Sequence, residues 1–276
     1  MNATTSEPLL LSDRKGGVLR LTLNRPRARN ALSSGLMRAL LEALEHAASD
    51  AAVKVIVLAA NGPVFSAGHD LREMSQARAD GDKGKESFAA LFTQCSDLML
   101  AIVCHPRPVI AEVQGLATAA GCQLVASCDL AVAADTAAFA TPGVDIGLFC
   151  STPMVALSRA IGRKAAMEML LTGEMVEAEE ARRIGLINRV VAPDLLESET
   201  LALAGKIAAK PRGTLKIGKE AFYRQLEMPL AEAYAYASKV MTENMLDAEA
   251  CEGIGAFIEK REPRWPGSLS PSGGEG

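Results

Sequence analysis

The chain lacks both an excess of basic residues and any long apolar run. Its 276 residues include 29 Lys and Arg against 33 Asp and Glu, for a net charge of -4, whereas nucleic-acid-binding domains usually carry a basic surface. No uninterrupted apolar stretch reaches the roughly 18 residues that span a bilayer, and no basic segment followed by an apolar core opens the sequence. We therefore expect a cytoplasmic protein with no nucleic-acid partner and no membrane partner.

Cysteine is present, but not in a pattern typical of metal or redox sites. The six cysteines form no CxxC pair and lie mostly inside apolar stretches. Cys104 adjoins His105, but no further ligands follow at the spacing of a metal site. The sequence therefore predicts buried, reduced thiols and no metal site.

The first 60 residues show the patterns of an α/β fold. Short apolar runs on either side of the SDRKGG segment predict a β-hairpin over residues 9–23. Apolar residues then recur at helical spacing in a helix that Ser33 or Ser34 caps and that ends near Ala48. Residues 53–60 are apolar on both faces, as expected of a strand in a covered, mainly parallel sheet.

Two segments of small residues follow strands. After the strand at 53–60, the loop containing Ala67 and Gly68 lies at a carboxyl end, where open α/β sheets bind ligands. Residues 113–130, VQGLATAAGCQLVASCDL, read as strand, turn, short helix and strand. Small side chains there would let a negative charge approach the free N–H groups of the helix's first turn. The alternative is that they only allow the helix to pack closely on a sheet.

Ordered motifs over nearly the whole chain resemble the crotonase (enoyl-CoA hydratase/isomerase) superfamily. They are LNRPRARNALS, VIVLAANGPVFSAGHDL, PVIAEVQGLATAAGCQLVASCDLAVAA, FATPGVDIGL, RKAAMEMLLTGEMVEAEEARRIGLINRVV and GIGAFIEKREPRW. The resemblance implies an α/β fold with a crotonase-like ββα spiral over residues 1–195 and a C-terminal helical trimerisation region over 196–276. It also implies a homotrimer or a hexamer made of two trimers. An apolar stripe within 215–260 agrees with burial against partner subunits.

The resemblance implies an acyl-CoA substrate and no cofactor other than the coenzyme A that the substrate itself carries. In this family a thioester carbonyl lies between two backbone N–H groups, which by position here belong to Ala67 and Ala120. Such an oxyanion hole stabilises the negative charge of an enolate, typically by about 10²- to 10³-fold in rate per donor. We therefore expect enolate chemistry on the thioester of a fatty acyl-CoA.

The resemblance also implies residues that bind coenzyme A. For Arg27 and Lys260 the alternative is a solvated charge, and for Phe257 it is a subunit interface. The family position of His69 usually serves binding rather than proton transfer. The implied coenzyme A residues are Arg27, His69, Asp70, Leu71, Phe257 and Lys260.

The two glutamates of family hydratases are missing, because their positions hold Gln123 and Gly143. Neither residue exchanges a proton, so hydration should be weak, and restoring both glutamates should increase it. Gln123 is still expected in the catalytic site, where it can orient a water molecule. Asp145 is a candidate replacement acid, although a structural hydrogen bond is the simpler role, and Glu112 is expected to pair with an Arg or Lys.

Three functions remain open from the sequence. The first is a hydratase- or isomerase-like enzyme with altered acid/base groups. The second is another acyl-CoA chemistry, such as thioester hydrolysis or decarboxylation. The third is a non-catalytic protein that binds acyl-CoA.

Overall fold

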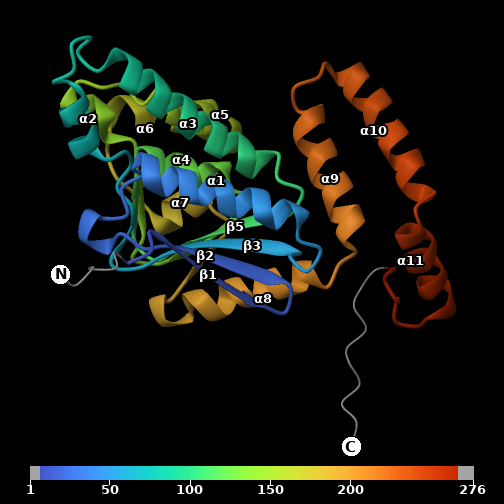
Figure 1. The fold of residues 1–276 in the computed structure, drawn as a ribbon. Coiled ribbons are helices and arrows are strands. Elements are labelled where there is room, and N and C mark those ends of the chain that lie inside the picture. Colours follow the sequence, from blue (N-terminus) through green and yellow to red (C-terminus); the bar gives the residue numbers. More distant parts are fainter. Residues whose placement is uncertain (1–6, 267–276) are drawn as a thin grey trace, which may run out of the picture. The chain divides into compact units, whose positions relative to one another are not determined.

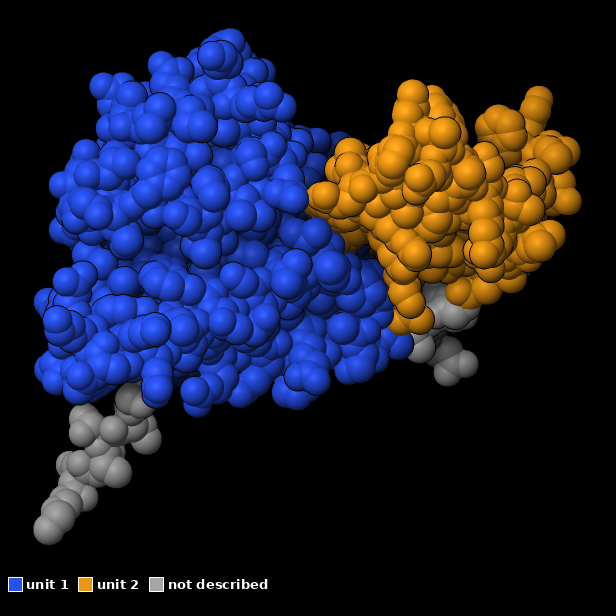
Figure 2. All heavy atoms as spheres, turned by 90° about the horizontal axis from the view of Figure 1, so that it is seen from above, with its two compact units in different colours: residues 1–207 blue, residues 208–276 orange. Residues whose placement is uncertain are grey.

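A computed structural model describes residues 7–266 of the protein (Figure 1). The chain divides into two compact units, residues 1–207 and 208–276, which Figure 2 shows in different colours. The boundary between these units falls later than residue 195, where the sequence suggests that the spiral ends. As a division between a binding core and an assembly region, the boundary at 195 stays a prediction.

The first unit is built on a sheet of six strands in the order β1-β2-β3-β5-β7-β10. The β1–β2 pair is antiparallel and every other neighbouring pair is parallel. The pairing of Leu10 with Leu23 confirms the predicted hairpin. The strands are β1 Leu10–Lys15, β2 Val18–Leu23, β3 Val55–Ala60, β5 Val109–Val113, β7 Leu130–Ala134 and β10 Arg189–Val191.

A second sheet has four strands in the order β4-β6-β8-β9. After β3, β5 and β7 the chain moves to β4, β6 and β8 respectively, and helical segments follow each of these pairs. Each turn thus contributes one strand to each sheet, which is the ββα spiral expected from the sequence. The strands are β4 Val64–Ser66, β6 Leu116–Thr118, β8 Ala138–Ala140 and β9 Val176–Glu177.

Helices cover the first sheet on one face (Figure 1). Ser33 caps α1 by accepting a hydrogen bond from the N–H of Leu36, which confirms the predicted start of this helix. α3 is long and apolar enough to cross a membrane by length and composition alone, but its buried residues pack into the core with α1 and α4. α1 Ser34–Ser49 contacts β1 and β2, and α3 Lys85–Val103 packs on α1. α2 Leu71–Ala77 lies against α3, and α4 Ala120–Ser127 contacts β4 and β6 of the second sheet.

The rest of the first unit consists of short helices and α8. Figure 1 shows α8 against the opposite face of the first sheet. Leu196, Thr200 and Ala204 of α8 are buried. The remaining elements are η1 Pro26–Ala28, η2 Pro142–Ile146, α5 Pro153–Ala160, α6 Arg163–Thr172, α7 Ala178–Ile184, η3 Pro193–Leu195 and α8 Leu196–Ala208.

The second unit contains three helices within its described residues, α9 Arg212–Gln225, α10 Leu230–Met245 and α11 Ala248–Glu259. Large apolar side chains remain exposed on them in the single chain. The most exposed are Leu230, Tyr234, Leu246, Phe257 and Ile258, each at 70% or more.

Candidate functional site

The site begins where two parallel neighbours of the second sheet, β4 and β6, end side by side. Ser66, the last residue of β4, pairs with Ala117 of β6. Because the strands run parallel, the segments that follow them also come together. Residues 67–69 and 119–120 therefore meet at one edge of the sheet.

Gly68 lets the two segments approach closely. It has φ of +87°, and a Cβ at this position would lie 2.9 Å from Ala119 Cβ and 3.4 Å from Ala120 N. Gly121 is equally restricted, because its Cβ would lie 2.3 Å from the Ser66 carbonyl oxygen. No other residue type fits either position without moving the backbone. The small residues thus do allow close packing, and they also bring the loop to the first turn of α4.

The start of α4 leaves one N–H group available. Ala119 has φ of 51° and its N–H donates to the Ala140 carbonyl. The N–H of Gln123 donates to Ala119, as in a regular helix. Among the described residues no acceptor faces the N–H of Ala120, the first residue of α4. That group is free to donate to a ligand, and its role in an oxyanion hole stays a prediction.

The second predicted donor, the N–H of Ala67, already has an acceptor. It donates to the Arg29 carbonyl at 3.0 Å, and the carbonyl of Gly68 accepts from Leu32 N at 2.7 Å. The N–H of His69 has no acceptor within residues 7–266. We therefore correct the sequence prediction: the free donor on this loop belongs to His69, two residues further on. The sequence motif alone does not reveal which carbonyl the Ala67 N–H meets.

A cavity of about 480 Å³ opens beside this loop, and several arginine side chains line it. Its walls include Arg27, His69, Asp70 and Leu71, so the structure brings these four predicted residues together, and Ala67 lines it as well. Three further arginines that sequence reasoning did not single out also line it, namely Arg25, Arg29 and Arg72. Arg25 and Arg29 lie in the RPRARN segment on either side of Arg27. The alternation of arginines in this segment was the sequence feature that could have predicted their place in the cavity.

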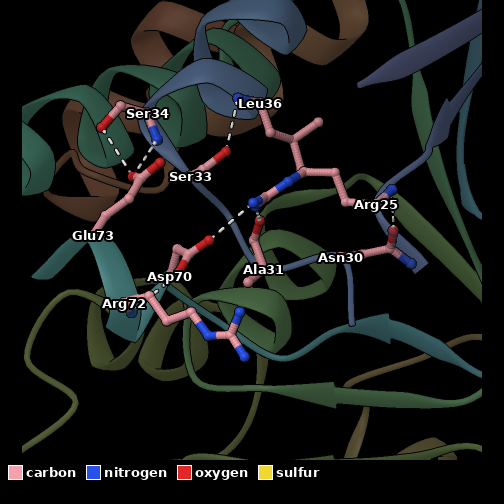
Figure 3. Close-up of polar contacts among 9 residues, drawn as sticks. All are labelled: Arg25, Asn30, Ala31, Ser33, Ser34, Leu36, Asp70, Arg72 and Glu73. Atoms are coloured by element: carbon pink, nitrogen blue, oxygen red, sulfur yellow. Dashed lines mark hydrogen bonds and ion pairs between the residues drawn. The ribbon is translucent and has the colours of Figure 1, made fainter. Parts of the chain in front are cut away.

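Arg25 and Asp70 both line the cavity and are joined by a hydrogen bond, which Figure 3 shows. Arg25 Nη2 donates to Asp70 Oδ2 at 2.9 Å, and Arg25 Nη1 donates to the Ala31 carbonyl at 2.6 Å. Burial acts to raise the pKa of Asp70, but the hydrogen bonds from Arg25 and from the Arg72 N–H, with the charge of Arg25, lower it overall. Asp70 is therefore ionised at neutral pH and caps α2 rather than exchanging protons.

The other cavity arginines have no such partner. No described residue accepts a hydrogen bond from the guanidinium groups of Arg27, Arg29 or Arg72 or pairs with them. Three free cations in one cavity suit a multiply charged anion such as a phosphate.

The His69 ring lies in the protein interior, against Phe92 of α3. Their ring centroids are 5.5 Å apart in an edge-to-face arrangement. Burial lowers the pKa of His69, while the nearby Leu32 backbone and the negative charge of Glu73 act to raise it. The Leu32 backbone is close to the ring but does not form a hydrogen bond of normal geometry with it. Both ring nitrogens are buried and have no hydrogen-bond partner in the part of the chain that the structure describes. The imidazole is therefore neutral at pH 7 and has unused hydrogen-bonding capacity.

Gln123, where the sequence resemblance predicts a lost glutamate, is buried on α4 and points toward α3. Its Oε1 is 3.8 Å from the Sγ of Cys95, a weak hydrogen bond. Burial raises the pKa of the Cys95 thiol to about 11, so it remains protonated. The side-chain partner of Gln123 within residues 7–266 is thus a neutral thiol and not a carboxylate.

Gly143, where the resemblance predicts the second lost glutamate, has no room for any side chain. A Cβ there would lie 2.0 Å from the Leu148 carbonyl oxygen and 2.8 Å from Cys150 Sγ. The turn is fixed by a hydrogen bond from Leu148 N to the Gly143 carbonyl at 2.8 Å. The loop backbone thus occupies the place where a glutamate side chain would begin.

Neither candidate replacement carboxylate reaches the cavity lining. Asp145 is exposed on η2. Glu112 is buried on the face of the first sheet that α8 covers, where Arg20 Nη2 donates to its Oε1 at 2.5 Å, which confirms the expected ion pair. Burial raises the pKa of Glu112, and Arg20 opposes that shift.

Phe257 and Lys260 lie in the second unit. Phe257 is 85% exposed, and Lys260 ends α11 with φ of 55°. Their predicted role at coenzyme A stays a prediction.

Comparison with known families and proteins identifies the family of the chain. The family described as "Enoyl-CoA hydratase/isomerase" matches residues 13–268. The chain belongs to this family. It is 50% identical over 261 residues to mouse enoyl-CoA hydratase domain-containing protein 3, mitochondrial, a match that covers 94% of this chain and 85% of the mouse protein. It is 35% identical to the 2,3-dehydroadipyl-CoA hydratase of Escherichia coli, over 94% and 98% of the two chains.

Solved structures of family members confirm the crotonase-like fold. An enoyl-CoA hydratase from Mycobacterium smegmatis matches with a TM-score of 0.90 at 56% identity, over 94% of this chain and 99% of the other. Human enoyl coenzyme A hydratase domain-containing protein 3 matches with a TM-score of 0.89 at 46% identity, over 94% and 100%.

The comparisons overturn the predicted cytoplasmic location. The mouse, rat and human relatives are all named mitochondrial proteins. The prediction rested on the lack of a recognisable leader at the start of the sequence, which is weak evidence because the start of a sequence does not fix where the protein works.

Proposed function

We propose that this family member binds an acyl-CoA thioester and stabilises the enolate form of its acyl group. The observation that carries the proposal is the pair of free backbone N–H groups, on His69 and Ala120, held at one sheet edge by Gly68. Two such donors suit an oxygen that gains negative charge during a reaction. The Escherichia coli relative, whose name gives an acyl-CoA substrate, supports the choice of ligand.

The cationic cavity supports a phosphate-bearing ligand. Arg27, Arg29 and Arg72 offer unpaired guanidinium groups beside the same loop that carries the His69 N–H. The phosphates of coenzyme A would lie among them, and the thioester would extend toward α4. Arg25 would hold the wall through Asp70 instead of binding the ligand directly.

The site favours enolate chemistry without efficient hydration. Adding water across a double bond needs one group to take a proton from water and another to protonate carbon. Gln123 cannot exchange protons and Gly143 has no side chain. Thioester hydrolysis and decarboxylation also place negative charge on the carbonyl oxygen, and they remain alternatives at the same donors. A protein that binds acyl-CoA without turnover is the non-catalytic alternative.

We also propose that the second unit mediates assembly into a trimer or hexamer. Its exposed apolar side chains, such as Leu230, Tyr234 and Phe257, suit burial against other copies of the chain. Light scattering on the purified protein tests this directly, and a monomer would contradict it.

Calorimetric titration with butanoyl-CoA tests the binding proposal. Arg27→Gln and Arg72→Gln should each weaken binding, and added salt should weaken wild-type binding because the contacts are ionic. Arg14→Gln is the matched control, since Arg14 is exposed and pairs with Asp50 on the hairpin side. Equal affinity in all four proteins would reject the cavity as the phosphate site.

The donor pair needs its own test. Gly68→Val should push the loop away from Ala119 and should weaken binding of butanoyl-CoA more than binding of free coenzyme A, which has no carbonyl. Equal losses for both ligands would contradict the placement of the carbonyl at His69 and Ala120.

A further inference from the structure

We infer that the imidazole of His69 is the catalytic base of this site, removing a proton from the carbon next to the thioester carbonyl. This inference rests on the proposed function. It assigns to the side chain of His69 a role separate from that of its backbone N–H.

The first step of the argument is chemical capacity. Of the titratable side chains that line the cavity, Asp70 is held ionised by Arg25, and the arginines do not lose their protons. His69 is the remaining group among those lining residues that gains and loses a proton near pH 7. Gln123, Gly143, the exposed Asp145 and the distant Glu112 offer no substitute.

The second step is position. His69 directly follows Gly68, which lies against Ala119 and Ala120. Its ring contacts Phe92, and Cys95, one turn further along α3, contacts Gln123. The ring therefore packs on the same helix, α3, that Gln123 contacts through Cys95, and it lies on the loop that carries the free His69 N–H.

The third step is the unmet hydrogen bonding of the ring. Both nitrogens are buried without a partner, and an unsatisfied buried polar group is costly in a folded protein. A structural histidine normally finds a partner, as His105 does with the Leu44 carbonyl at 2.9 Å. His69 lacks such a partner among the described residues, so its ring nitrogens remain available to a proton donor.

The proposed step is balanced within the site. The C–H bond at the carbon next to the carbonyl breaks, its electron pair moves into the enolate, and the oxygen is stabilised by the N–H groups of His69 and Ala120. The proton goes to a ring nitrogen of His69. Return of a proton to the same carbon gives exchange, and return to the γ-carbon of an unsaturated chain moves the double bond. A single base completes either cycle, so isomerisation fits this site better than hydration.

Hydrogen exchange into butanoyl-CoA tests the inference without knowledge of the natural substrate. The wild-type protein should incorporate deuterium from D2O next to the thioester, as measured by mass spectrometry. His69→Phe keeps a ring against Phe92 but has no base, so exchange should fall by about 10²-fold or more while butanoyl-CoA still binds. His69→Gln tests the same loss should the Phe variant fold poorly. His46→Gln is the matched control, because His46 is exposed on α1.

The pH profile separates a base from a merely structural ring. Exchange should rise with pH through a midpoint below the ordinary histidine value, because only the neutral ring accepts a proton. The groups that face the ring are Glu73 from α2, the uncharged Phe92 from α3 and the Leu32 carbonyl. Because the charge of Glu73 raises the pKa of His69, Glu73→Gln should move the midpoint to lower pH.

Each outcome bears on a different proposal. Exchange that is equal in wild type and His69→Phe, or wild-type binding with no exchange, would overturn His69 as the base and leave the binding proposal standing. Failure of the wild-type protein to bind butanoyl-CoA would overturn the proposed function itself.

Discussion

Gln123 and Gly143 stand where the sequence resemblance implies the two glutamates of family hydratases, and their surroundings differ. Gln123 is an amide of nearly the same shape as glutamate, and α4 and α3 leave space for it. At Gly143 the Leu148 carbonyl oxygen lies where a Cβ would be. The first position has lost a charge, whereas at the second the local backbone is incompatible with a side chain. Hydration therefore cannot be restored by the same kind of substitution at both.

The largest expected effect is that of Gly143→Glu. The overlap with Leu148 requires the turn to move, so the variant should lose about 4 kcal/mol of stability or fail to fold. Urea denaturation measures this. Gly205→Ala is the control, since Gly205 is exposed in α8 with open space around it and the change should add roughly 0.5–1 kcal/mol. A Gly143→Glu protein as stable as wild type would show that the turn is not fixed.

Arg20→Met tests the buried ion pair between Arg20 and Glu112, which lies on the face of the first sheet that α8 covers. Removing Arg20 leaves Glu112 buried and unpaired, at a cost of roughly 3 kcal/mol at pH 7.5. The folded-state pKa of Glu112 is already raised, and losing Arg20 raises it further. The loss of stability caused by Arg20→Met should therefore be small at a pH below the pKa of Glu112 in the unfolded chain. It should grow as the pH rises through the pKa of Glu112 in the folded protein.

Unfolding at pH 4 and pH 7.5 measures this difference. Arg14→Met is the control, because the exposed Arg14–Asp50 pair should contribute about 0–1 kcal/mol. A penalty for Arg20→Met that does not change with pH would mean that Glu112 is not the residue left uncompensated.

Gln123→Glu should destabilise the protein less than Gly143→Glu or Arg20→Met does, and it should increase hydratase activity. A buried carboxylate beside the protonated Cys95 costs about 1–2 kcal/mol. It also supplies one proton-transfer group, so hydration of crotonyl-CoA should rise by up to about 10²-fold. Loss of the conjugated thioester absorbance follows the reaction, with Gln123→Ala as the control. No gain over that control would place Gln123 outside the reacting region.

The smallest expected effect is a difference in the rate of thiol labelling among the cysteines. It tests whether the turn at Gly143 keeps the thiol of Cys150 buried. Cys104 and Cys251 are exposed and should react first with iodoacetamide. Burial raises the pKa of Cys122 to about 12 and also raises that of Cys150 beside Gly143, so these thiols should react slowly. Mass spectrometry locates the labels. Early labelling of Cys150 would indicate that the turn opens readily.

Local patterns predicted the elements well because their causes are local. Alternating residues gave the β1–β2 hairpin, and Ser33 with helical spacing gave α1. The small residues at 117–121 correctly indicated a backbone that other groups approach closely. The assignment of Ala67 as a donor was wrong because that N–H is taken by the Arg29 carbonyl, which lies 38 residues away in the sequence. Similarly, no local pattern indicates that Leu148 closes the position at Gly143.

By itself the sequence determined the β1–β2 hairpin and the start of α1, because these depend on residue identity and local spacing, and its motifs determined the family and with it the ββα spiral. Only the tertiary structure decided that His69 carries the second free N–H and that its ring has no partner. It also decided that four arginines share one cavity and that Glu112 pairs with Arg20 on the opposite face of the sheet. Hydrogen bonds, burial and charge pairing join residues distant along the chain, so they are defined only once the fold brings those residues together.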